Sequence, residues 1–278
     1  MCIRDRLQGR FRFTSGRRLW LIIADDDAEF EGLDGNPESE ATFAVKITSE
    51  IQSQIIPLGI TTSKIGECLI VLGPDWLGPS DADSVDTLIH ELAHCFQFEL
   101  SEAGGVDLGL QPDWLIEGSA TWIASQYMLE TRSTLGWISP WTDYFSDKEF
   151  DLFGASYNDV NFWQQAANKN TGANRGPYIT ILNALQSSTN SVEILRSITD
   201  ILQEDFLPTW SSSSFRNVDY GPPWEMFLPE PVDNLGRSFI GPESLETRIL
   251  ADFGTSRTAL LSDNRIFSTP HILSLIHI

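Results

Sequence analysis

Two short runs of apolar residues near the start of the chain predict buried β-strands. They span residues 18–24 (RLWLIIA) and 68–73 (CLIVLG). Acidic residues follow the first run and a Gly-Pro pair closes the second, and such residues commonly bound strands. Between the runs, apolar residues recur at four-residue spacing, which predicts a helix over residues 39–56. These apolar residues are Phe43, Ile47, Ile51 and Ile55.

From Ser84 onward, the apolar positions follow the period of an α-helix. They are Val85, Leu88, Ile89, Leu92, Ala93 and Phe96. Positions with this spacing share one helix face. We therefore predict a helix that begins at Ser84, with this residue as its N-cap. A second helix is predicted from Pro112 to about residue 129, with Asp113 as its cap.

The remaining segments complete an α+β fold class. The aromatic-rich residues 137–153 predict a loop, and residues 204–242, rich in Pro and Ser, predict an irregular segment. Further helical patterns cover residues 158–167, 178–186 and 191–203. We expect a small N-terminal mixed sheet packed on the helix that begins at Ser84, followed by a mainly helical part.

Most of the chain is expected to form one domain. It covers residues 7–203, with the sheet and the first long helix over about 18–110 and the helical part over about 111–203. Residues 204–272 would be a tail or the start of a further region. The end hexapeptides, Met1–Arg6 and Leu273–Ile278, read as translations of opposite strands of one transposon-type sequencing adapter. We therefore leave them out of the fold reasoning.

Composition and charge exclude several classes of function. Apolar residues make up 41% of the chain, which is enough for a core. No run of about 18 apolar residues is present, so no transmembrane helix is predicted. The net charge of −21 disfavours nucleic acid and anionic membranes as partners. We therefore expect that the protein binds neither nucleic acid nor an anionic membrane. The sequence does not indicate an oligomeric state.

Outside the first hexapeptide, the chain has two cysteines, Cys68 and Cys95. Two are too few for a disulfide framework, although a single bridge between them is one alternative. Each lies in an apolar segment, so we expect instead that both are buried as small apolar residues.

The most informative segment is residues 90–94, HELAH, which fits the pattern HExxH in a chain with only four histidines. On a helix, residues four apart lie on the same face, so His90 and His94 can both point at one metal ion. Glu91 would lie beside that ion as a general base. Cys95 would point about 100° away from His94 and is not expected to be a ligand.

A catalytic zinc site needs a third protein ligand and an open position for water. Glu117 is the candidate for this ligand, because it lies in the second predicted helix, 23 residues after His94. That separation allows the first helix to end and the second to return beside it. The small residues Gly118 and Ala120 would let the two helices approach closely. A carboxylate at such an interface is costly unless it is paired or bound to a metal.

HELAH followed by WLIEGSATW resembles the gluzincin metallopeptidases of the thermolysin and aminopeptidase superfamily. These proteins carry HExxH and a downstream glutamate in a helix of the W-L-x-E-G-x-A type. The resemblance covers about residues 18–186 in the order of the elements, and it is specific over residues 84–127. It implies that residues 7–203 are a metallopeptidase catalytic domain.

The resemblance also implies roles for individual residues. His90, His94 and Glu117 would bind zinc, and Glu91 would activate the water that is the fourth ligand. Members of this group usually add a Tyr or His that stabilises the oxyanion. In this chain Tyr157 opens a helix with aromatic residues soon after it, which makes it the first choice.

Tyr178 is a second choice for the oxyanion, so that role stays open. The chain departs from the family pattern at two points. The G-x-M-E-N stretch with which the aminopeptidase branch binds a substrate's amino terminus is absent, which puts exopeptidase action in doubt. Thermolysin-like members place an Asp four residues after the ligand Glu, whereas this chain has Thr121. Asp86, one turn before His90, is either the substitute or a solvated residue of the first helical turn.

We therefore expect a zinc-dependent endopeptidase that acts on a peptide or protein substrate. The substrate would lie extended along the strand at residues 68–73. A secreted or cell-envelope location is expected. The alternative is a catalytically silent protein that keeps this fold, with or without the metal, as a binding module.

Overall fold

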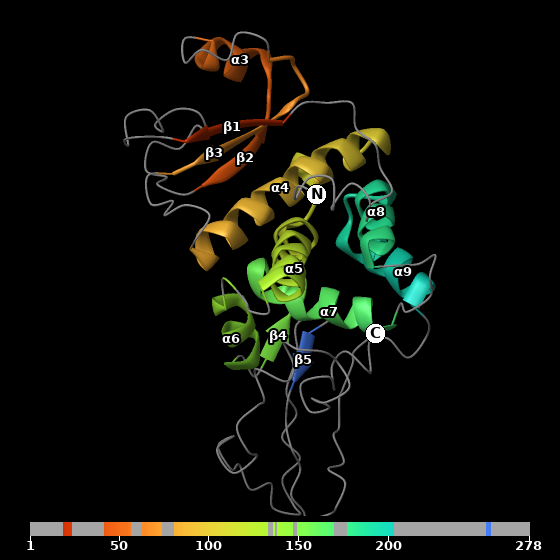
Figure 1. Cartoon of the computed structure of the whole chain (residues 1–278). Helices are drawn as coiled ribbons and strands as arrows, with labels where there is room; N and C mark the ends of the chain where they lie inside the picture. The colour runs from red at the N-terminus through yellow and green to blue at the C-terminus, as the bar shows by residue number, and fades with distance from the viewer. Residues whose placement is uncertain are drawn as a thin grey trace, which may run out of the picture.

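A computed structural model gives the fold of most of the first two hundred residues. The residues that it describes are 19–23, 42–56, 63–73, 81–132, 136, 138–146, 149–169, 177–202 and 254–256. Within these ranges, a small mixed sheet lies at one end and helices make up most of the rest (Figure 1). The fold class is therefore α+β, as predicted. The predicted irregular segment at 204–242 and both terminal hexapeptides lie outside the described residues.

The larger sheet has three strands: β1 (Leu19–Ile23), β2 (Phe43–Lys46) and β3 (Cys68–Leu72). Their spatial order is β1-β3-β2, so β3 is the central strand. β1 runs parallel to β3, whereas β2 runs antiparallel to β3, with Ala44 opposite Ile70. Both strands predicted from apolar runs, β1 and β3, are confirmed.

The predicted helix over residues 39–56 is wrong in its first half. Phe43–Lys46 is strand β2, and only Ser49–Ile55 is helical, as α3. Thr48 separates the two elements because it caps α3, accepting a hydrogen bond from the backbone N–H of Ile51. The four-residue spacing arose because Ile47, Ile51 and Ile55 pack on one face of the sheet, although Ile47 precedes the helix.

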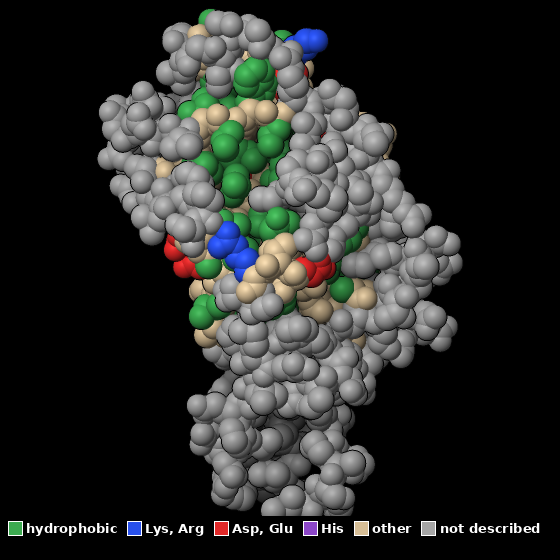
Figure 2. All heavy atoms as spheres, in the orientation of Figure 1, with side chains coloured by type: hydrophobic (Ala, Val, Ile, Leu, Met, Phe, Trp, Pro, Cys, Tyr) green, Lys and Arg blue, Asp and Glu red, His purple; other side chains and the backbone are tan. Residues whose placement is uncertain are grey.

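The central strand β3 is buried on both faces. Its residues Cys68, Ile70 and Leu72 belong to the large core formed with the long helices, and Leu69 and Val71 face the smaller cluster under α3. A strand in this position needs apolar residues at every position, which explains the run CLIVL. Apolar side chains gather on the sheet end of the face shown in Figure 2.

The longest helix, α4, spans Ala82–Ala103 and carries the HELAH segment. The prediction of Ser84 as its N-cap is wrong, because the cap is Asp81. The Asp81 carboxylate accepts the backbone N–H of Ser84 at 2.8 Å, and this bond lowers the pKa of Asp81. Gly104 follows the last turn, and Gly105 takes a φ of 72°, a conformation that glycine adopts easily.

The second long helix, α5, spans Asp113–Arg132 and packs against α4, crossing it at a steep angle (Figure 1). It begins one residue after Pro112, so Asp113 lies in its first turn and is not its cap. Three predicted helices are confirmed, with small shifts at their ends. They are α7 (Val160–Lys169), α8 (Pro177–Ser187) and α9 (Ser191–Leu202).

The prediction of a loop at residues 137–153 is wrong, because this segment contains regular secondary structure. It holds α6 (Ser139–Ser146) and the short strand β4 (Glu149–Asp151), which pairs with β5 (Gly254–Ser256). The aromatic Trp141 and Tyr144 are buried, so they anchor α6 to the core. Two 3-10 turns complete the described elements, η1 (Leu108–Leu110) and η2 (Tyr157–Asp159).

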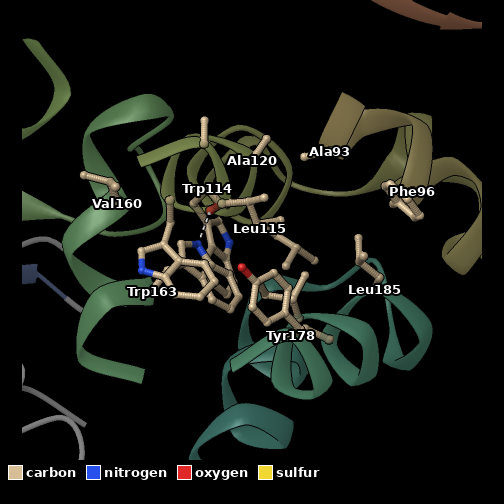
Figure 3. Close-up of a cluster of buried hydrophobic side chains, with 14 of the residues drawn as sticks. Ala93, Phe96, Trp114, Leu115, Ala120, Val160, Trp163, Tyr178 and Leu185 are labelled. Atoms are coloured by element: carbon tan, nitrogen blue, oxygen red, sulfur yellow. Dashed lines mark hydrogen bonds between the residues drawn. The ribbon is translucent and has the colours of Figure 1, made fainter. Parts of the chain in front are cut away.

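Stacked aromatic rings build the core beneath α5. Trp114 of α5 stacks on Trp163 of α7 with ring centroids 5.9 Å apart, and the Trp163 indole N–H donates to the backbone carbonyl of Trp114 (Figure 3). Phe162 meets both rings edge-on. This cluster fixes where α5 lies, and α5 in turn carries Glu117.

The expectation of two free cysteines is wrong, because Cys68 and Cys95 form a disulfide. Their Cα atoms are 5.6 Å apart, and both side chains are buried. The apolar segments that motivated the expectation are the two sides of one interface, since β3 packs against α4. Cys95 immediately follows His94, so the bond joins the central strand to the helix turn that carries the second histidine.

No helix in the described part of the chain is both long enough and apolar enough to cross a membrane.

Removing the disulfide should lower the stability of this domain. The two cysteines are 27 residues apart, and a crosslink over a loop of that length stabilises the folded state by roughly 2–4 kcal/mol. We expect the double variant C68A/C95A to lose about that much free energy of unfolding in urea titrations. A variant with an unchanged midpoint and slope would contradict this expectation.

Candidate metal centre

One face of α4 brings together the residues of the HELAH segment. His90, Glu91 and His94 are each less than a tenth exposed, and their possible ligand atoms lie within 4.8 Å of one another. The two imidazole rings meet edge to face, with centroids 4.6 Å apart and with Nε2 of His90 3.0 Å from Nε2 of His94. A buried group of this composition could hold a metal ion, and the identity of that ion does not follow from the geometry.

Helix α5 adds a carboxylate to this group. Oε2 of Glu117 lies 3.1 Å from Nε2 of His90 and 3.3 Å from Nε2 of His94. The Glu117 side chain is 25% exposed, so the group opens to solvent on this side. The sequence-based pairing of HELAH with Glu117 thus corresponds to a direct contact between α4 and α5.

The other ring nitrogen of each histidine faces a protein oxygen. Nδ1 of His94 lies 2.7 Å from Oε1 of Gln97, and Nδ1 of His90 lies 3.3 Å from the hydroxyl of Thr121. The Thr121 hydroxyl donates to the backbone carbonyl of Glu117 at 2.8 Å, so toward His90 it acts as an acceptor. Both Nδ1 atoms therefore carry protons, which leaves the lone pair of each Nε2 available to bind a metal ion or a further proton.

Three electron-rich atoms that converge in this way require a cation or a proton between them. Donors of a tetrahedral zinc ion, each about 2.0–2.1 Å from the metal, lie about 3.3 Å from one another. The separations of the two Nε2 atoms and Oε2 of Glu117 are 3.0, 3.1 and 3.3 Å. The residues present therefore fit a metal bound by His90, His94 and Glu117.

The two carboxylates of the site differ in their environments. Glu91 has a carboxylate oxygen within 4.8 Å of the two imidazoles, yet Glu117 comes within hydrogen-bond distance of both. These shorter distances make Glu117 the better third ligand. Burial raises the pKa of Glu91 to about 7. The charge of His94 and a hydrogen bond from the backbone N–H of Ala44 act in the opposite direction but are weaker. Burial also opposes the charge of Glu117, but hydrogen bonds from the two histidines lower the pKa of Glu117 below its ordinary value.

Burial affects the two histidines unequally. It lowers the pKa of His90 to about 4, although the hydrogen bond with Glu117 acts in the opposite direction. Burial opposes the charged form of His94 as well, but its hydrogen bond to Glu117 and the charges of Glu91 and Glu117 prevail and raise its pKa. The environment therefore favours the protonated form of His94 over the protonated form of His90.

Of the two tyrosines considered, Tyr157 is the one at the site. Its ring lies 5.6 Å from the ring of His90, and its hydroxyl hydrogen-bonds to Glu117. Tyr157 is 41% exposed, but the partial burial of its hydroxyl and the charges of Glu117 and Glu91 raise its pKa, so the hydroxyl keeps its proton. Tyr178 instead points into the aromatic core, 5.4 Å from the ring of Trp122 (Figure 3).

The Asp86 side chain is buried at 3% exposure, so it is not a solvated residue of the first turn. Asp86 packs against Gly136, and a Cβ added at Gly136 would overlap the side chain of Asp86. Thr121, four residues after Glu117, contacts Nδ1 of His90 through its hydroxyl.

The strand beside the site is β2 and not β3. β3 has β1 on one side and β2 on the other, so the expectation that a substrate pairs with residues 68–73 is wrong. β2 lies at an edge of the three described strands and packs against α4. Its Ala44 bonds Glu91 through the backbone, and Lys46 pairs with Glu102 of α4 at 2.9 Å.

Gly118 leaves space for the side chain of Asp159, a role that was not predicted from the sequence. A methyl group at this position would overlap the carboxylate of Asp159, which lies at the end of η2. Asp159 is fully buried, and neither of its oxygens has a hydrogen-bond partner in another described residue. Burial raises the pKa of Asp159 well above its ordinary value. The close approach of η2 to α5 at this point brings Tyr157, two residues earlier, toward the site.

Comparisons with protein-family models, with curated proteins and with solved structures give no match to this chain. Membership of the gluzincins therefore stays a prediction from the sequence motifs.

The substitution Gly118→Ala should destabilise the protein, because the added methyl group has no space beside Asp159. We expect a loss of roughly 1–3 kcal/mol of unfolding free energy. Adding Asp159→Ala should restore part of this loss, since it clears the space and removes an unpartnered buried carboxyl. Denaturant titrations measure both effects.

Gly109→Ala is the matched control, because its Cβ would meet only Asp107 Oδ1, at an ordinary 3.5 Å. If Gly118→Ala were no more destabilising than Gly109→Ala, the close contact between η2 and α5 would be refuted.

Proposed function

We propose that this protein is a zinc-dependent peptidase in which His90, His94 and Glu117 bind the metal. The observation that carries the proposal is the convergence of two imidazole nitrogens and one carboxylate oxygen within 3.3 Å of one another. Such a set of two histidines and one glutamate is a common catalytic zinc site, with the fourth position free for water. The buried Glu91 beside it supports a hydrolytic role over a structural one.

The proposed reaction is hydrolysis of a peptide bond. When bound, zinc lowers the pKa of a water molecule toward 7 and polarises the carbonyl group of the substrate. The Glu91 carboxylate accepts the proton of the attacking water and delivers it to the nitrogen of the leaving amine. The Tyr157 hydroxyl, which keeps its proton, donates a hydrogen bond to the substrate oxygen as negative charge develops there.

The substrate would lie extended along β2. This strand lies at an edge of the three described strands, and an extended peptide can add to such an edge through backbone hydrogen bonds. Ala44 of β2 already contacts Glu91, so a peptide on this edge would pass beside the proposed general base. An approach along the strand needs no free amino terminus, which supports endopeptidase action.

The disulfide supports a location outside the reducing cytosol. Cys68 and Cys95 are joined in the interior, and stable disulfides of this kind form mainly in oxidising compartments. We propose that the protein acts in the extracellular space or the cell envelope.

Two substitutions should separate chemistry from metal binding. Glu91→Gln should lower the cleavage rate of a denatured, fluorescently labelled protein by about 10²–10⁴-fold, because the general base is lost. Its zinc affinity should stay close to that of the original protein. Glu117→Gln should weaken zinc binding by more than about 100-fold, since a direct ligand is lost. Zinc affinity is measured by competition with a chromophoric chelator.

The control for Glu117→Gln is Glu130→Gln, which removes an exposed carboxylate from the same helix. It should change neither zinc affinity nor turnover. Tight zinc binding without any turnover would instead identify a catalytically silent binding protein. Absence of zinc binding by the unsubstituted protein would refute the whole proposal.

Tyr157→Phe should lower kcat by roughly 10²-fold with little change in KM, because the lost hydroxyl is needed only as charge develops on the substrate oxygen. Zinc affinity should be unchanged. Tyr127→Phe on α5 is the control for loss of a phenol elsewhere. A Tyr157→Phe enzyme with full kcat would exclude the donor role.

A further inference from the structure

We propose that Gln97 is a positioning residue that fixes the orientation of His94 and ties it to the helix turn that carries Glu117. Its consequence for metal affinity rests on the proposed function, whereas its effect on His94 does not. The HExxH pattern gives Gln97 no role. It lies three residues after His94 on α4, and its side chain is completely buried.

The hydrogen bonds of Gln97 determine which way its amide points. The amide nitrogen donates to the backbone carbonyl of Ile116 at 2.8 Å and to the hydroxyl of Ser119 at 2.9 Å. A carbonyl oxygen can only accept, so the amide group facing Ile116 must be the N–H₂ end. Turning the amide over would place two oxygens against each other in the protein interior, at the cost of an unmade buried hydrogen bond.

This orientation decides which nitrogen of His94 carries the proton. The Gln97 oxygen faces Nδ1 of His94 at 2.7 Å, and an amide oxygen can only accept. Nδ1 must therefore be the N–H donor when the ring is neutral. Nε2 is left with its lone pair, directed at His90 and Glu117. A histidine that binds a metal through Nε2 needs this tautomer.

The same amide also connects the two helices of the site. Ile116 immediately precedes Glu117 in α5, and Ser119 follows two residues after it. Through one side chain, the turn of α5 that presents Glu117 is held at a fixed distance from His94. Gln97 therefore sets the spacing between a ligand from α4 and a ligand from α5, a spacing that a metal requires to be correct within a few tenths of an ångström.

Two variants separate this role from simple packing. Gln97→Met keeps the length of the side chain but removes every hydrogen bond. Gln97→Glu keeps an oxygen that can accept from His94 but loses the donors to Ile116. The matched control is Gln111→Met, because Gln111 is also buried and donates through its amide to the backbone carbonyl of Leu185.

The first measurement needs no metal. In ¹⁵N-labelled, metal-free protein at alkaline pH, where both imidazoles are neutral, long-range ¹H–¹⁵N spectra report which ring nitrogen of His94 is protonated. We expect the proton on Nδ1 in the original protein, in Gln97→Glu and in Gln111→Met. Gln97→Met should shift it largely to Nε2. A proton on Nε2 of His94 in the original protein would overturn the inference.

The second measurement is the affinity for Zn²⁺ alone, by chelator competition. Gln97→Met should bind zinc about 10–100-fold more weakly than Gln111→Met, the range typical for loss of a partner of a metal-bound histidine. Gln97→Glu should fall between the two. Equal affinities of Gln97→Met and Gln111→Met, with tight binding by the original protein, would contradict the positioning role but leave the zinc site standing.

If the original protein binds no zinc, the proposed function fails, and the His94 spectra alone decide whether Gln97 positions the ring. If Gln97→Met does not fold, Gln97→Glu still tests the inference. It should retain the Nδ1 proton on His94 while its zinc affinity falls below that of Gln111→Met.

Discussion

The contact of Glu117 with two buried imidazoles is the constraint on which the rest of the structure depends. A carboxylate and two ring nitrogens within 3.3 Å of one another attract a positive charge, either a metal ion or a proton, and such a charge stabilises them in a protein interior. For this contact to form, α4 and α5 must run close together. Ser119 of α5 faces α4, and Gln97 of α4 bridges the two helices through its hydrogen bonds to Ile116 and Ser119.

Several layers of packing support that contact. Above it, the disulfide from Cys95 to Cys68 ties α4 to the central strand, while the edge strand β2 reaches Glu91 through Ala44. Below it, the stacked rings of Trp114 and Trp163 hold α5 on α7. The turn before α7 then brings Tyr157 to His90. Each side chain of the site is thus held by an element that is itself anchored in the core.

The grouping of His90 with His94 could be predicted from the sequence because their spacing is set by helix geometry. Four residues separate His90 from His94, which places them on one face in any α-helix. The aromatic and small residues around Glu117 indicated a second helix that packs closely. The core strand CLIVL was equally clear, since a strand buried on both faces is apolar throughout.

Other features could not be predicted because they depend on contacts between distant segments. Phe43 and Ile47 follow a helical spacing, yet pairing with β3 makes Phe43–Lys46 a strand. Neither Cys68 nor Cys95 carries a local signal for a partner 27 residues away. Gln97 resembles any polar residue on a helix until Ile116 and Ser119 are placed beside it. The close packing of Asp159 against Gly118 likewise gives no signal in the local sequence of either residue.

The central claim is that two histidines of α4 and one glutamate of α5 bind a single zinc ion. The most direct test is a crystal structure of the zinc-loaded protein with anomalous scattering recorded at the zinc edge. The account predicts one peak, about 2.0–2.1 Å from Nε2 of His90, Nε2 of His94 and Oε2 of Glu117, with Glu91 outside bonding distance. A peak bound by Glu91 with Glu117 turned away, or no peak at this position, would contradict it.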